Sequence, residues 1–164
     1  MTQKAGATKI QPSAPDPALN KLDVFVGKWK VEGKSYAEGS SSENLQVSSV
    51  EMIFVQTGEW LSGGFFLVNR WDGRVGESEF NGMEVIGYDA KSRTYISRMF
   101  DNGGNAPTYQ ISLHDNVWTY SGELQRATFE FSDDSRTVKT HWDWRKTDSE
   151  NWLPLCDLTA SKAN

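Results

Sequence analysis

The sequence predicts an all-β domain, a closed antiparallel up-and-down barrel of about ten strands with a short N-terminal helix. Segments rich in Val, Ile, Thr and aromatic residues recur at intervals of roughly ten residues, with turn residues between them. No long helical pattern follows residue 27. Sequential strands joined by short hairpins form a meander, whose two edges stay exposed unless the sheet closes. A closed barrel of this size holds one small ligand or a packed interior.

The N-terminal part of the chain divides into a tail and a helix. We expect residues 1–16 to be a disordered tail without the apolar core of a secretory signal, and residues 17–160 to form the single barrel domain. Asp16 suits a helix N-cap, Pro17 suits the first helical position, and Gly27 can end the helix. Three apolar residues recur at helical spacing between these signals: Leu19, Leu22 and Phe25.

Alternating patterns then predict the strands. They lie at residues 29–36, 45–56, 59–70, 80–88, 94–100, 108–113, 117–122, 125–131, 137–145 and 151–159. Residues 72–79 are expected to form a loop, and Gly63 and Gly64 a kink within a strand. The segment 65–68 is apolar on both faces, so its outer face suits cover by the helix or by a second copy of the chain. A homodimer is therefore among our expectations.

Composition bounds the class of protein. The chain has 164 residues, which fits one domain, and its 20 Trp, Tyr and Phe residues (7, 5 and 8) exclude wholesale disorder. A single cysteine excludes an internal disulfide. The 17 basic and 22 acidic residues give a net charge of −5, which disfavours nucleic acid and anionic membrane surfaces as partners. We expect a cytoplasmic domain with neither partner.

Side-chain alternation places residues inside or outside the barrel. In 137–145, Val138, Thr140 and Trp142 share the face expected to point inward, and His141 lies on the opposite face. In 94–100 either face could point inward; we favour the one with Tyr95 and Met99, because the other would bury Arg98. The expected ligand-binding residues are Met52, Phe54, Phe66, Tyr95, Met99, Tyr109, Trp118 and Trp142.

Two resemblances support this architecture. Gly27-Lys28-Trp29 resembles the Gly-x-Trp motif that opens lipocalins and their calycin relatives, and makes Gly27 and Trp29 structural residues. A closer likeness, over most of residues 20–160, is to the bacterial family called domain of unknown function 1579, for which a lipocalin-like barrel is expected and no activity is established. Its segments are WLSGGFFLV (60–68), RWDG (70–73), GYDA (87–90) and FDNGG (100–104). This resemblance implies the fold and transfers no catalytic residue.

The calycin comparison also shows a departure. Lipocalins place an Arg or Lys late in the last strand across the motif Trp. Here the expected last strand offers only Lys162, beyond its end, and Arg145 lies in the strand before it.

Few side chains suggest catalytic chemistry. His114, His141 and the lone Cys156 have no metal-ligand spacing, and no nucleophile elbow or phosphate-binding glycine motif is present, so we expect no metal and no cofactor. Cys156 is expected to be a buried, inert thiol.

The leading functional hypothesis is non-covalent binding of a small, largely apolar molecule in an aromatic-lined cavity. One alternative is a barrel enzyme, an isomerase, cyclase or hydrolase with an interior carboxylate or tyrosine, for which a buried Glu84 would be the best general base. Others are a haem-binding barrel that uses His141, which alternation disfavours, and a barrel whose interior is filled.

Overall fold

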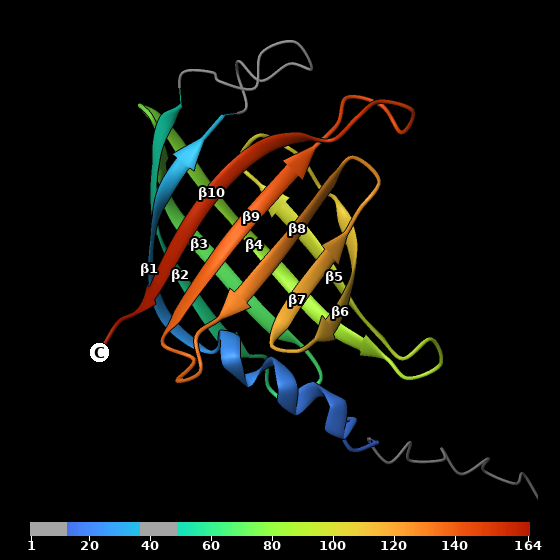
Figure 1. Cartoon of the computed structure of the whole chain (residues 1–164). Helices are drawn as coiled ribbons and strands as arrows, with labels where there is room; N and C mark the ends of the chain where they lie inside the picture. The colour runs from blue at the N-terminus through green and yellow to red at the C-terminus, as the bar shows by residue number, and fades with distance from the viewer. Residues whose placement is uncertain (1–12, 37–48) are drawn as a thin grey trace, which may run out of the picture.

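The structure, a computed structural model, describes residues 13–36 and 49–164 and contains a closed barrel of ten antiparallel strands (Figure 1). Each strand pairs with its neighbours in sequence, and β1 pairs with β10 to close the sheet. The elements are η1 (Pro17–Phe25), β1 (Gly27–Ser35), β2 (Val50–Trp60), β3 (Leu67–Val75), β4 (Ser78–Asp89), β5 (Thr94–Asp101), β6 (Thr108–His114), β7 (Val117–Ser121), β8 (Gln125–Phe131), β9 (Thr137–Trp144) and β10 (Leu153–Lys162).

This architecture confirms the predicted fold class. The expected strand at 45–56 begins at Val50, with residues 45–48 outside the described part of the chain. Residues 1–12 of the expected tail are also outside it. Among the described residues, no helix has the length and apolarity needed to cross a membrane.

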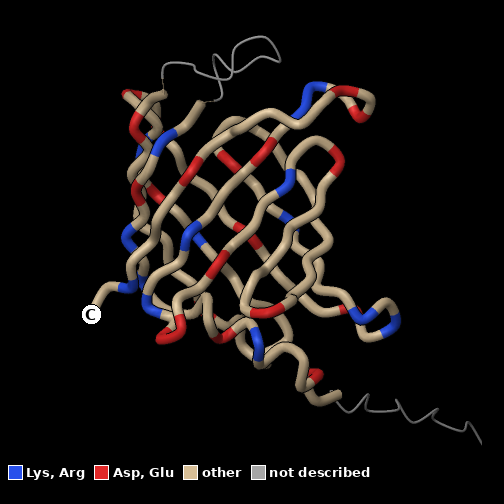
Figure 2. The backbone as a smooth tube through the Cα atoms, in the orientation of Figure 1, with Lys and Arg blue, Asp and Glu red and all other residues tan. Residues whose placement is uncertain are grey.

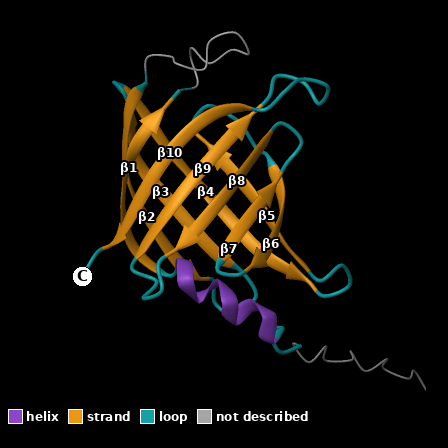
Figure 3. Ribbon diagram, viewed as in Figure 1, coloured by secondary structure: helices purple, strands orange, loops and turns teal. Residues whose placement is uncertain are grey.

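The N-terminal helix lies across one end of the barrel (Figure 3). It is a 3₁₀ helix, and the Asp16 carboxylate accepts a hydrogen bond from the backbone N–H of Ala18 at 2.8 Å. A 3₁₀ helix has three residues per turn, so Leu19, Leu22 and Phe25 align on one face, and all three are buried. Barrel side chains bind the helix through three hydrogen bonds: Trp29 Nε1 to Phe25 O (3.2 Å), Trp60 Nε1 to Asp23 Oδ1 (2.8 Å) and Tyr95 OH to Ala18 O (2.6 Å).

Alternation along the strands sorts side chains as predicted in β5 and β9. In β5, Ser97 is fully buried, while Arg98 points outward, with its guanidinium carbon 5.4 Å from the centroid of the Phe100 ring. In β9, Thr140 is buried, and His141 lies on the outer face. Charged residues of both signs are distributed along the strands and loops (Figure 2).

The predicted strand at 59–70 and loop at 72–79 are wrong. β2 continues to Trp60, residues 61–66 form the turn, and β3 runs from Leu67 to Val75. Gly63 and Gly64 have φ angles of 102° and 75°, which a turn requires and an extended strand does not. The run 65–68 is apolar at every position, so it carried no alternation from which to locate the turn.

This shift moves Phe66 out of the barrel interior. Its side chain lies in the turn and is 46% exposed, so the expectation that it faces a cavity is wrong. The ring lies over Gly87 of β4, where a Cβ atom would come within 2.8 Å of it.

The last strand extends beyond its predicted end at 159 to Lys162, which pairs with Trp29 of β1. The Lys162 ammonium lies 5.3 Å from the centroid of the Trp29 ring. The cation that calycins place across the motif Trp is therefore present. Arg145 lies elsewhere, 4.3 Å from the ring centroid of Trp152.

Candidate functional site

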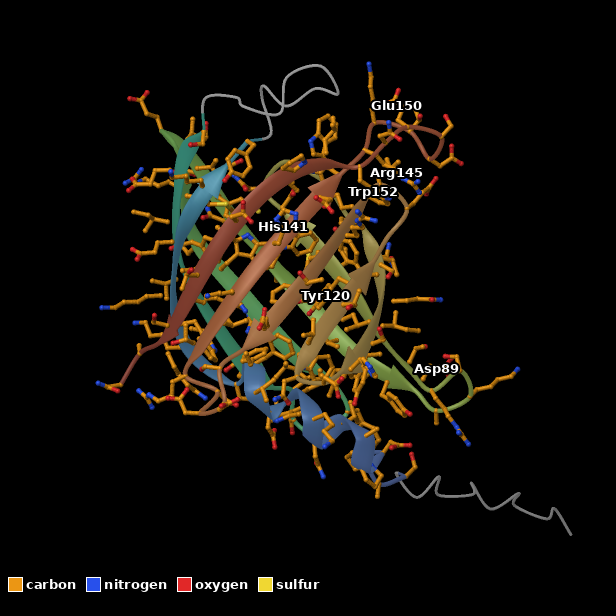
Figure 4. All side chains as sticks on the ribbon, viewed as in Figure 1. Asp89, Tyr120, His141, Arg145, Glu150 and Trp152 are labelled. Carbon is orange, nitrogen blue, oxygen red and sulfur yellow. The ribbon has the colours of Figure 1, made fainter. Side chains whose placement is uncertain are left out.

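A cavity of about 1080 Å³ occupies the barrel interior. Phe25, Trp29 and Phe131 line it at the end that the helix covers. Loop residues 105–107 and 122–124 line it at the other end. Figure 4 labels Arg145, Glu150 and Trp152 around the β9–β10 loop, which lies at this second end, away from the helix. The helix therefore covers one end of the cavity, and the loops 105–107 and 122–124 lie at the other.

Aromatic and aliphatic side chains make most of the wall. The Phe54 and Phe80 rings meet edge to face at 5.5 Å between centroids, and Trp142 contacts Tyr109 and Phe129 at 5.5 and 6.0 Å. Such edge-to-face packing fixes the orientation of the rings. The wall can therefore exclude water from an apolar molecule while keeping its own shape.

One buried polar cluster interrupts this wall. Glu84 of β4 is 4% exposed, and its Oε1 accepts a hydrogen bond from Ser97 Oγ at 2.5 Å. Its Oε2 accepts from Asn69 Nδ2 at 3.0 Å, and the Tyr120 hydroxyl also hydrogen-bonds the carboxyl group. Burial raises the pKa of Glu84, and these three hydrogen bonds oppose that rise without cancelling it.

Two tyrosines complete the polar part of the cavity. Tyr109 donates a hydrogen bond to Gln125 Oε1 at 2.7 Å. Burial, and secondarily the neighbouring Glu84, raise the pKa of both Tyr109 and Tyr120 far above the ordinary value. Both phenols are therefore neutral hydrogen-bonding groups at physiological pH.

The eight predicted ligand-binding residues lie in three places. Met52, Phe54, Met99, Tyr109 and Trp142 line the cavity. Tyr95 and Trp118 are buried at the end covered by the helix, with ring centroids 5.1 Å apart, and lie outside the cavity lining. Phe66 is on the outer surface, as described above.

Sequence reasoning missed part of the lining. Trp71 and Phe80 line the cavity from β3 and β4, but the expected loop at 72–79 hid the alternation of both strands. The available signal for these lining residues was the alternation along β3, in which every second residue shares one face: Asn69, Trp71, Gly73 and Val75.

Cys156 is buried, and burial raises the pKa of its thiol to about 12, with a smaller contribution from Asp157. This agrees with the expectation of an inert thiol.

The two histidines of the sequence do not line the cavity. His141 lies outside, with its Nδ1 2.6 Å from Asp157 Oδ1 and its Nε2 2.8 Å from Asp143 Oδ1. His114 is the last residue of β6, and its side chain is 92% exposed. A haem held by a histidine inside the barrel therefore does not fit these residues. Within the described residues no group of three or more His, Cys, Asp or Glu side chains could hold a metal ion.

A protein-family model described as "Protein of unknown function (DUF1579)" matches residues 14–150. The chain belongs to this family. The DUF1579 match confirms the resemblance drawn from the sequence, and the closed ten-stranded barrel is consistent with a lipocalin-like fold. Among curated proteins, none matches the chain significantly.

Two solved structures share the fold of this DUF1579 protein. The crystal structure of Rv2717c from M. tuberculosis has 11% sequence identity and a TM-score of 0.62, over 92% of this chain and 99% of that chain. The structure of the S-type phycobiliprotein lyase CPES from Guillardia theta has 10% identity and a TM-score of 0.52, over 88% of this chain and 91% of that chain. At these identities the likeness shows the fold alone.

Proposed function

We propose that this protein binds one small, largely apolar molecule non-covalently inside the barrel. The observation that supports the proposal is the cavity of about 1080 Å³, lined mainly by aromatic and aliphatic side chains. This volume is close to the upper end of the range for ordinary ligand pockets, which is roughly 300–1,000 Å³. The helix covers one end, so the ligand enters between the loops at the other end.

Dye binding with a matched pair of variants tests this proposal. Nile red, a neutral dye whose fluorescence rises in apolar surroundings, is expected to bind saturably at about one equivalent. Met52 lines the cavity, whereas its neighbour Ile53 faces outward and is 37% exposed. Met52→Trp should fill part of the cavity and weaken dye binding at least tenfold, and Ile53→Trp should leave it unchanged.

Thermal melts of both variants establish that they are folded before the dye is added. Equal loss in the two variants would place the dye on the outer surface and contradict the proposal. An absence of saturable binding to the wild-type protein would favour the filled-interior alternative.

A barrel enzyme is the second candidate, and the buried Glu84 favours it. A carboxyl group with a raised pKa beside a cavity suits a general acid or base. Native mass spectrometry of freshly purified protein would reveal any retained ligand. Chromatography of that ligand after incubation with wild type and with Glu84→Gln then separates the candidates, because an enzyme converts it in the wild type only and a binder leaves it unchanged.

A further inference from the structure

The charged side chains among the described residues that line the cavity have one sign. Three of these residues carry carboxyl groups, Glu84 in the interior and Asp101 and Glu123 toward the loops. Among the described residues that line the cavity there is no Lys, Arg or His. A ligand carboxylate would therefore find no cation among these lining residues and would meet acidic groups both at the entrance and within.

The interior carboxyl group is arranged to accept hydrogen bonds. The Asn69 amide can only donate through its Nδ2, so Glu84 Oε2 is the acceptor in that contact. The Ser97 hydroxyl donates to Oε1 at 2.5 Å, and the Tyr120 hydroxyl lies beside the same carboxyl group. A carboxylate offers about four acceptor positions, so these partners leave at least one for a ligand.

An ammonium group supplies what this site lacks. Glu84 is buried without a cationic partner among the described residues that hydrogen-bond it, and burial of an unpaired carboxylate is costly. A cation within hydrogen-bond distance would favour the ionised carboxylate and form a charge-assisted hydrogen bond. A second carboxylate at the same place would disfavour it by like-charge repulsion.

We propose that the molecule bound in the cavity is apolar and ends in an amine, whose ammonium group pairs with Glu84, and that the cavity discriminates against carboxylates such as fatty acids. This inference rests on the proposed function, since it names the chemical class of the ligand for the same cavity. The apolar part of the ligand would lie against Phe54, Phe80 and Trp142, and its charged end would meet the Glu84 cluster.

Displacement of Nile red by three probes of equal chain length tests the discrimination. Dodecylamine, dodecanol and dodecanoic acid are titrated at pH 7, each below its solubility limit and below any concentration at which it aggregates. We expect dodecylamine to displace the dye at a concentration at least tenfold below that of dodecanol, and dodecanoic acid to be the weakest. The expected ratio of the displacing concentrations of dodecanol and dodecylamine is on the order of tenfold or more. Two opposite charges in contact attract strongly enough to give this difference in affinity even at a high effective dielectric constant.

Two variants assign the effect to Glu84. Glu84→Gln keeps an acceptor for Asn69 and removes the charge, so the preference for dodecylamine should fall to within threefold of dodecanol. Glu130→Gln removes the same charge from the exposed outer face of β8 and should retain the wild-type order. An unchanged preference in Glu84→Gln would overturn the assignment.

The wild-type series decides the inference even if Glu84→Gln does not fold. Dodecanoic acid displacing the dye as well as dodecylamine would overturn the amine proposal, while displacement by dodecanol would leave the binding function standing. If the dye itself does not bind saturably, the proposed function fails first.

Discussion

Replacing Trp29 with alanine should destabilise the barrel more than replacing a surface tryptophan. Trp29 is 2% exposed at the start of β1. Its ring centroid lies 6.0 Å from that of Phe131, its Nε1 donates to Phe25 O at 3.2 Å, and the Lys162 ammonium lies 5.3 Å from its ring centroid. The side chain thus joins the first strand, the last strand and the helix.

The size of the loss follows from these contacts. Truncating a buried Trp to Ala costs about 3–5 kcal/mol. This range already includes the free energy of the lost hydrogen bond and of the lost cation–π contact, because truncation removes the whole side chain at once. At this chain length 1 kcal/mol lowers the melting temperature by about 2–4 °C, so we expect a fall of about 6–20 °C. Trp29→Phe keeps a ring and should lose roughly half as much.

Urea unfolding measures the effect, with Trp152→Ala as the control. Trp152 is half-buried, and the guanidinium carbons of Arg126 and Arg145 lie 4.6 and 4.3 Å from its ring centroid. Near the surface each such contact contributes about 0.5–1 kcal/mol. The reasoning is refuted if Trp29→Ala unfolds at the wild-type midpoint while Trp152→Ala unfolds at a much lower urea concentration.

Two further predictions concern titratable side chains. Burial disfavours the charged form of His141, but hydrogen bonds to Asp157 and Asp143 outweigh the effect of burial and raise the pKa of the imidazole. The protonated imidazole therefore stabilises the folded protein below about pH 6.5, and this stabilisation is lost as the pH rises through the folded-state pKa. His141→Gln should therefore lower the urea midpoint more at pH 6 than at pH 9, whereas His114→Gln, whose side chain is 92% exposed, should change neither midpoint. Cys156, with a thiol pKa of about 12 and 5% exposure, should resist iodoacetamide at pH 8 in the native protein and react in urea; rapid native alkylation would show that the β10 wall opens.

Local signals predicted the elements whose geometry is local. Asp16 and Pro17 marked the start of the helix because a cap and a fixed φ angle act over two or three residues. The faces of β9 followed from alternation, since successive side chains of any strand point to opposite sides. The turn between β2 and β3 could not be located in this way, because residues 65–68 are apolar throughout and fit several registers.

The sequence by itself determined a meander of strands with an aromatic interior and a helix at its start. The tertiary structure decided the closure of the sheet, the polar cluster and the cavity, because these features depend on how distant strands align. Closure of the sheet pairs Lys162 with Trp29 from opposite ends of the chain. The polar cluster brings Asn69, Glu84, Ser97 and Tyr120 together from β3, β4, β5 and β7. Whether aromatic side chains fill a barrel or enclose a cavity depends on its diameter and on where each ring packs, which alternation along single strands does not specify.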